Sequence, residues 1–260
     1  MPGTGDLVNS TTIPRAYPIT YSADMTNCNA FTKPVPRMPR DCGMFSPCTN
    51  PRGKIWYDFS GPFKRKRIDL ESGACHQVVG NAAPGHFGPA NEYTGPGTIL
   101  DAPDANGAST QYVFWPELKQ CCQCCGAKDG CGVVRPDWLA RGNATLVQGK
   151  RVLVDDSEKR LSDVWHLKAG QNNYMYIDSA TGLPVGYRMN MTADELDNPL
   201  FKVAEKWMHR NLSDWTMIRT LYNVSTAPID PSVFALPEYC KTATGVLNKC
   251  SGLWCPLMRA

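Results

Sequence analysis

Five closely spaced cysteines are the residues of this chain best placed to do chemistry. Cys121, Cys122, Cys124 and Cys125 surround a single glutamine, and Cys131 follows six residues later. Thiolates at this spacing are able to share a zinc ion or an iron–sulfur cluster. Adjacent cysteines rarely bond to each other, so the alternative is a hub from which several disulfides run to distant segments. No second Cys-x-x-Cys and no histidine pair at zinc-finger spacing accompanies the cluster, and this favours the disulfide hub.

The cysteine content of the whole chain indicates an oxidising compartment. Twelve cysteines occur in 260 residues, an even number, as a complete disulfide set requires. The predicted disulfide cysteines are Cys28, Cys42, Cys48, Cys75, Cys121, Cys122, Cys124, Cys125, Cys131, Cys240, Cys250 and Cys255. Five N-glycosylation acceptors accompany them, at Asn9, Asn143, Asn190, Asn211 and Asn223. We therefore expect a secreted, extracellular glycoprotein, present here as the mature chain because no secretory apolar region opens it.

The composition and the absence of known motifs argue against a nucleic-acid-binding protein, a membrane-spanning protein and an enzyme. The net charge of +3 is too balanced to indicate nucleic acid. The one basic run, Lys64 to Arg67, is interpreted as a solvated strand edge, with a patch for an anionic partner as the alternative. No apolar stretch is long enough to span a membrane. No nucleophile elbow, zinc-protease motif or phosphate-binding loop is present, and the four histidines fall in no catalytic motif, so we expect no enzyme and no catalytic residues.

A strand with alternating apolar residues is the strongest local signal. Between Leu183 and Met191 every second residue is apolar, which is the period of a β-strand with one buried face. Methionine is flexible and polarisable, so a Met-rich sheet face suits an irregular apolar ligand. The ordinary alternative is a core face covered by the protein itself. The predicted pocket wall consists of Trp165, Met175, Ile177, Leu183, Val185, Tyr187, Met189 and Met191.

The remaining pattern predicts a mainly β protein with few helices. Strands are expected at 54–60, 63–70, 111–115, 144–148, 151–154, 163–168, 173–178 and 215–224, with a hairpin loop at 178–182. Residues 80–110 are expected to form a long loop, 116–125 one or two helical turns, and 136–139 a short helix. A helix at 194–209 is expected to cover the sheet. Asp155 and Asp156 are weak candidates for a calcium ion, and no other cofactor is expected.

Several segments resemble the ependymin-related family of secreted glycoproteins. They are KIWYDF at 54–59, the basic strand 64–70, YMYID at 174–178, TGLPVGYR at 181–188 and the end motif at 228–240. The resemblance implies two stacked, curved antiparallel sheets, half-barrel-like as in bacterial lipoprotein carriers, with a deep hydrophobic pocket and calcium-dependent behaviour. It also implies that Cys240 is a disulfide partner and that the hairpin 174–191 is part of the pocket wall. The cysteine cluster, the N-terminal arm and the extra C-terminal cysteines depart from the family.

These observations predict three regions and leave three rival functions. An irregular N-terminal arm is expected at 1–53, a β-domain at 54–240 with a Cys-rich insert at about 117–139, and a disulfide-pinned tail at 241–260. The first hypothesis is a carrier of an apolar or lipid-like small molecule. The second is a structural or adhesive component of an extracellular assembly, in contact with other proteins or with further copies of itself. An enzyme or thiol redox protein using Cys121–Cys125 is the third.

Overall fold

The computed structural model describes residues 16–31, 52–71, 95–104, 106–129, 131–154, 156–169, 171–191, 202, 215–241, 248–250 and 255. These residues form a mainly β protein with a few short helices. The strands are β1 (Thr20–Phe31), β2 (Arg52–Asp58), β3 (Arg65–Leu70), β4 (Gly97–Pro103), β5 (Ser109–Trp115), β6 (Gln120–Gly126), β7 (Thr145–Arg151), β8 (Ser162–Ala169), β9 (Gln171–Asp178), β10 (Pro184–Met191) and β11 (Trp215–Ser225). The α-helix α2 covers Trp138–Arg141, and the short 3₁₀ helices are η1 (Ala127–Asp129), η3 (Pro231–Phe234) and η4 (Glu238–Cys240).

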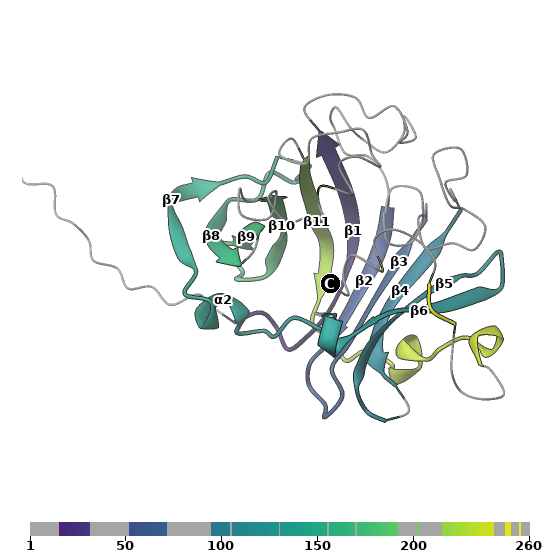
Figure 1. Cartoon of the computed structure of the whole chain (residues 1–260). Coiled ribbons are helices and arrows are strands. Elements are labelled where there is room, and N and C mark those ends of the chain that lie inside the picture. The colour runs from purple at the N-terminus through teal and green to yellow at the C-terminus, as the bar shows by residue number, and fades with distance from the viewer. Residues whose placement is uncertain are drawn as a thin grey trace, which may run out of the picture.

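All the described strands belong to one antiparallel sheet of 11 strands. Their order is β6-β5-β4-β3-β2-β1-β11-β10-β9-β8-β7. Two meanders, β1–β6 and β7–β11, are joined because the first strand pairs with the last, from Ser22 opposite Ser225 to Phe31 opposite Trp215. The prediction of two stacked sheets is therefore wrong for the described strands. The sheet instead bends, and β7 to β10 curl away from the flatter half of β1 to β6 (Figure 1).

Four predictions of secondary structure are wrong. The strand expected at 151–154 is absent from the described residues 152–154, because β7 (Thr145–Arg151) ends at Arg151. Part of the expected irregular arm is β1, which lies in the middle of the sheet between β2 and β11. The expected loop at 80–110 contains β4 and the start of β5. The segment 116–125, expected to form helical turns, contains β6 instead, because it pairs with β5 as a hairpin. Its cysteines pack on both faces of the sheet.

Other expectations agree with the structure or lie outside it. The short helix near 136–139 is α2, and strands β8, β9 and β11 match their predicted ranges closely. The hairpin loop at 178–182 is present, with Gly182 donating to the Asp178 carbonyl. The predicted helix at 194–209 lies outside the described residues, apart from Lys202. The division of the chain at residues 53 and 240 stays a prediction.

The sheet is covered on both faces. We call the face that carries Tyr57, Met175 and Tyr187 the inner face, and the opposite one the outer face. On the inner face, α2 covers the curled half, where Leu139 packs with Trp165 and Leu167. On the outer face, the segment 229–240 covers β4 and β5, and Phe234 packs there.

A bulge in β10 changes which residues share a face. The pairing of β10 with β9 shifts register between Pro184 and Gly186, and Gly186 has a φ of +154°. As a result Val185 packs on the outer face with Val164 and Ile218, whereas Tyr187 faces inward. The prediction that all five apolar residues from Leu183 to Met191 share one face is therefore wrong at Val185.

Residues 65–67 of the basic run lie in β3, in the interior of the sheet, because β3 pairs with both β2 and β4. Their charges are neutralised within the chain, whereas Lys64, which precedes β3, donates to the Phe59 and Gly61 carbonyls. The nitrogens of Arg65, Lys66 and Arg67 lie 2.5, 2.6 and 2.8 Å from the carboxylates of Asp58, Asp101 and Asp69 respectively. The prediction of a solvated sheet edge is wrong for β3, and these three ion pairs neutralise every charge of the run except that of Lys64.

Candidate ligand-binding cavity

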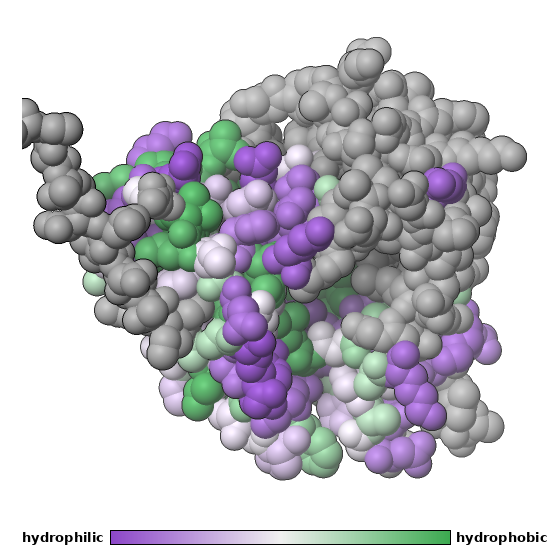
Figure 2. Space-filling model, turned by 60° about the vertical axis from the view of Figure 1, so that its left-hand side comes forward, coloured by the Kyte–Doolittle hydropathy of each residue, from purple (hydrophilic) through white to green (hydrophobic). Residues whose placement is uncertain are grey.

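A cavity of about 250 Å³ opens on the inner face, where the two halves of the bent sheet meet. Strands β1, β2, β3, β9, β10 and β11 contribute to its wall, together with the segment 134–138. Its apolar lining includes Ile55, Leu221, Val134 and the sulfur-containing side chains of Met175 and Met189. Figure 2, which brings the β7–β10 side forward, shows hydrophobic residues at the surface among hydrophilic ones.

Four tyrosines give the cavity an aromatic wall. Tyr17, Tyr21, Tyr57 and Tyr187 all line it. Tyr21 and Tyr57 stack, with ring centroids 5.1 Å apart. Burial raises the pKa of Tyr21 to about 12 and raises the pKa of Tyr17 and Tyr57 well above the ordinary value. These phenols therefore remain neutral at physiological pH and keep their protons for hydrogen bonds.

Two hydrogen bonds hold the segment 134–138 over the cavity. The Tyr57 hydroxyl donates to the Val134 carbonyl at 2.6 Å. The Tyr17 backbone N–H donates to the Pro136 carbonyl at 3.0 Å. Trp138, the first residue of α2, also lines the cavity. The segment 134–138 therefore forms part of the cavity wall, and these two hydrogen bonds hold it against the sheet.

Two cations face this apolar wall. Lys66 pairs with Asp101, which also accepts a hydrogen bond from the Gln111 side chain at 3.0 Å. Arg219 is only 8% exposed, and its Nε donates to Asn27 Oδ1 at 3.2 Å. The guanidinium carbon lies 5.1 Å from the Tyr187 ring centroid, within cation–π range. Among the described residues Arg219 has no carboxylate partner.

The predicted pocket residues fall into three groups. Met175, Tyr187 and Met189 line the cavity. Trp165 and Ile177 lie on the same face but pack under α2. Val185 faces outward, Leu183 is half-buried before β10 begins, and Met191 is buried at the end of that strand. Their role in binding a ligand stays a prediction.

Sequence reasoning missed most of the cavity wall. Tyr17 and Tyr21 fall within the predicted irregular arm, although Tyr21, Ala23 and Met25 alternate there and are all buried. Arg219 alternates with Leu221 in a strand that was predicted correctly. A cation at an inward position of an apolar strand is the signal that would have identified it.

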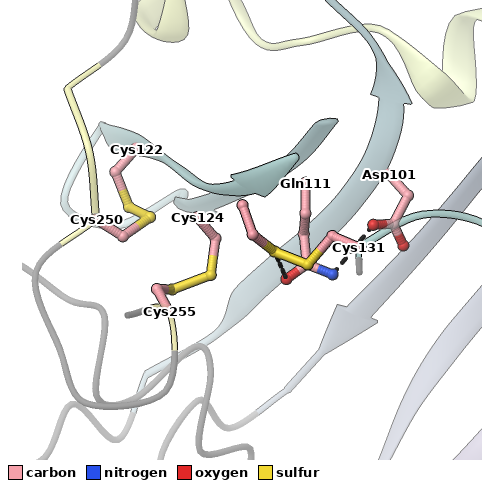
Figure 3. The surroundings of a disulfide bond; sticks show 8 residues. Asp101, Gln111, Cys122, Cys124, Cys131, Cys250 and Cys255 are labelled. Atoms are coloured by element: carbon pink, nitrogen blue, oxygen red, sulfur yellow. Dashed lines mark hydrogen bonds between the residues drawn. A yellow bond between two sulfur atoms is a disulfide. The ribbon is translucent and has the colours of Figure 1, made fainter. Parts of the chain in front are cut away.

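Four disulfides anchor β6, and Figure 3 shows the three whose sulfurs gather on the inner face. Cys121 bonds to Cys240, Cys122 to Cys250, Cys124 to Cys255, and Cys125 to Cys131. A register shift opposite Gln111 and Tyr112 places Cys124 and Cys125 together on the inner side, whereas Cys121 faces outward. Three bridges thus lead to the C-terminal segment, as a disulfide hub predicts.

The metal interpretation does not fit these cysteines. The sulfurs of Cys124, Cys250 and Cys255 lie within 4.8 Å of one another. All three are already bonded in disulfides, and a metal ligand must be a thiolate. Cys125 Sγ lies 3.7 Å from Gln111 Oε1, but a disulfide sulfur has no proton to donate. Of the other predicted cysteines, Cys42, Cys48 and Cys75 and the side chain of Cys28 lie outside what the structure describes.

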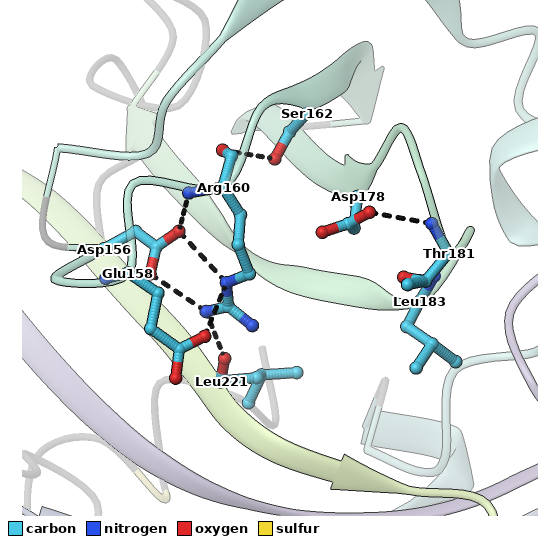
Figure 4. A network of polar contacts seen from close by, with 8 residues as sticks. All are labelled: Asp156, Glu158, Arg160, Ser162, Asp178, Thr181, Leu183 and Leu221. Carbon is cyan, nitrogen blue, oxygen red and sulfur yellow. Dashed lines mark hydrogen bonds and ion pairs between the residues drawn. The ribbon is translucent and has the colours of Figure 1, made fainter.

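One of the two calcium candidates is fully engaged by the protein (Figure 4). Asp156 is buried, and its carboxylate accepts hydrogen bonds from the Glu158 and Arg160 backbone N–H groups and from the Arg160 guanidinium. Arg160 also donates to the Leu221 carbonyl at 2.6 Å, which ties this turn to β11. A calcium ion would have to displace the guanidinium. Asp155 lies outside the described residues.

The glycosylation acceptors differ in exposure. Asn143 is exposed in the turn after α2, and Asn223 is exposed on β11, where its Nδ2 donates to Asp24 at 2.8 Å. Asn190 is half-buried within β10, between strands on both sides. Asn9 and Asn211 lie outside the described residues. Asn143 is therefore the acceptor most open to a glycan among those described.

Comparisons with known proteins give a fold likeness only. No family model and no curated protein matches the sequence. A DUF1329 family protein from Desulfovibrio piger is 8% identical, covering 84% of this chain and 90% of its own, with a TM-score of 0.38. An outer membrane lipoprotein-sorting protein domain from Vibrio parahaemolyticus is 8% identical, covering 83% and 88%, with a TM-score of 0.36. A LolA superfamily protein from Nitrosomonas europaea is 10% identical, covering 86% and 93%, with a TM-score of 0.32.

Likenesses of this degree carry no argument about function, and no family match supports the resemblance to ependymins. The described disulfides are consistent with an extracytoplasmic location. Among the described helices none has the length and hydrophobicity that a membrane span requires.

Proposed function

We propose that this protein is a secreted glycoprotein that binds a hydrophobic or amphipathic small molecule and catalyses no reaction. The observation that supports this is the inner-face cavity, which is walled by Met175, Met189 and tyrosine rings. An apolar ligand chain gains about 0.8 kcal/mol for each methylene group that it buries. Methionine side chains adapt to irregular chains at low cost, and the tyrosine hydroxyls offer polar contacts at the wall.

Introducing a charge into the cavity tests this proposal. Met189→Asp places a carboxylate in the apolar wall, where desolvation disfavours both the charge and a neighbouring apolar ligand. We expect uptake of a fluorescent fatty acid to weaken by at least about tenfold, since roughly 1.4 kcal/mol corresponds to a factor of ten. Arg188→Asp is the matched control, because Arg188 is the preceding residue, is exposed and faces outward. Equal uptake by wild type and Met189→Asp, with intact disulfides, would contradict the proposal.

A second candidate function is a subunit of an extracellular assembly. Four apolar side chains are exposed on and near β7, one of the two edge strands of the described sheet: Leu146 at 42%, Val152 at 36%, Val154 at 68% and Leu161 at 57%. Exposed apolar residues beside an unpaired edge favour association with other chains. Light scattering separates the two functions. A monomer that binds the fatty acid supports the carrier, whereas a large assembly without uptake supports the structural role.

A further inference from the structure

The charge balance of the cavity is the starting point. The positive charge of Lys66 is matched by Asp101, whose carboxylate is fully buried. The charge of Arg219 is not matched by any described carboxylate, although its side chain is nine-tenths buried. Its contacts are the Asn27 oxygen and the face of the Tyr187 ring. Burying a cation without an anion is costly, so a cation kept in this position indicates that a negative group joins it.

Two further donors without acceptors accompany Arg219. Asn27 is fully buried, and its Nδ2 has no hydrogen-bond partner among the described residues. The amide orientation is fixed because the other atom, Oδ1, accepts from Arg219. The hydroxyl of Tyr17, on the cavity wall, is also buried and has no partner in the described part of the chain. Buried donors are normally satisfied, so these groups require an acceptor that the described side chains do not supply.

The geometry points to a carboxylate headgroup as the polar end of the ligand, with Arg219 as the residue that binds it; this inference rests on the proposed function. A carboxylate offers two oxygens that match the planar fork of a guanidinium and accept additional hydrogen bonds. Asn27 lies directly across the β1–β11 pair from Arg219, on the same face of the sheet. Its Nδ2 is a second donor beside the guanidinium, and the apolar tail then lies along Met175 and Met189.

The size of the cavity favours a ligand with one chain. Its volume of about 250 Å³ lies below the range for small-molecule sites, roughly 300–1,000 Å³. A single chain fills such a volume, whereas a lipid with two acyl chains would leave much of its apolar surface outside it. We therefore specify the ligand class as a single-chain fatty acid or an acid of similar shape.

Ligands that differ only at the headgroup test this inference on the unmodified protein. Isothermal titration calorimetry with dodecanoate, dodecanol and dodecylamine at pH 7.4 compares an anion, a neutral group and a cation on one tail. We expect dodecanoate to bind at least about tenfold more tightly than dodecanol, and dodecylamine to bind most weakly. If dodecanol binds as tightly as dodecanoate, the headgroup assignment is overturned while the carrier function stands. If none of the three binds, the carrier function itself fails.

A variant then assigns the effect to one side chain. Arg219→Gln removes the charge but retains a hydrogen-bonding side chain, and we expect it to weaken dodecanoate about tenfold or more while dodecanol changes less than about threefold. Arg188→Gln is the control, because it removes an exposed arginine on β10 and leaves the cavity intact. An equal loss for both ligands in Arg219→Gln would indicate a structural role and overturn the assignment. If that variant does not fold, the headgroup series on the wild type still decides.

Discussion

Replacing Gly186 by alanine tests whether the bulge in β10 shapes the cavity. Gly186 has a φ of +154°, which side-chain-bearing residues rarely adopt. An added Cβ would overlap the Arg219 carbonyl oxygen and lie 2.9 Å from Leu153 Cδ2. The overlapping atom belongs to the backbone of the neighbouring strand, so a rotamer change cannot relieve it.

The cost has two sources, each of known order. Backbone strain at an unfavourable φ costs about 1–3 kcal/mol. Overpacking against fixed neighbours costs about 1–3 kcal/mol more. We therefore expect Gly186→Ala to lower the free energy of unfolding by roughly 2–6 kcal/mol. Because Gly186 and Tyr187 both line the cavity, ligand affinity should fall as well.

Denaturant unfolding under oxidising conditions measures this loss. Gly149→Ala is the control, because Gly149 also has a positive φ, +77°, but a Cβ there meets no atom within 4 Å. It should cost only about 1–2 kcal/mol, for backbone strain alone. If Gly186→Ala is no less stable than Gly149→Ala, then the close approach of Gly186 to β11 does not matter, and our account of the bulge is refuted.

Three further predictions concern ion pairs and disulfides. Burial alone would raise the pKa of Asp58, but hydrogen bonds from Ser60 and Arg65 outweigh it and hold the pKa below its usual range. The stability that the Asp58 carboxylate contributes is therefore fully present above its unfolded-state pKa of about 4, and it is lost as the pH falls through its folded-state pKa. In unfolding experiments, the difference in the free energy of unfolding between wild type and Asp58→Asn should therefore become smaller below about pH 4. Lys66→Met leaves the buried Asp101 charge unpaired and should lower the free energy of unfolding, measured by thermal unfolding, by about 3 kcal/mol or more. Adding Asp101→Asn should recover part of this loss. If Lys66→Met is as stable as wild type, the ion pair does not contribute as described. Thiol labelling under denaturant, followed by peptide mapping, should modify none of the eight cysteines in the four described disulfides, whereas labelling of Cys121 to Cys125 would revive a redox or metal role.

Alternation along single strands made part of the fold predictable. The period of two located β2 and β10, where Ile55 alternates with Tyr57 and Tyr187 with Met189. Turn residues and β-forming residue types located β3, β9 and β11. The adjacency of Cys121 and Cys122 indicated bridges to distant segments, since neighbouring cysteines bond poorly to each other. β1 and β6 were missed because polar residues or cysteines obscure their alternation.

The candidate site was only partly predictable. The sequence identified Met175, Tyr187 and Met189, which lie on regular parts of their strands. It misplaced Val185, because a single-residue bulge reverses the alternation and leaves no unambiguous mark in the sequence. The sequence indicated no partner for Arg219, because Asn27, which accepts its hydrogen bond, lies 192 residues away in the chain.

The sequence alone determined that this protein is a disulfide-bonded, mainly β chain. It also determined that many strands alternate apolar and polar residues and that methionines are among the apolar ones. Only the tertiary structure decided that β1 pairs with β11 and so joins two meanders into one bent sheet. The reason is that alternation fixes which face a side chain takes within its own strand, whereas pairing between strands far apart in the chain depends on the whole sheet. The cavity and Arg219, which has no carboxylate partner among the described residues, lie at that junction, where strands far apart in the chain meet.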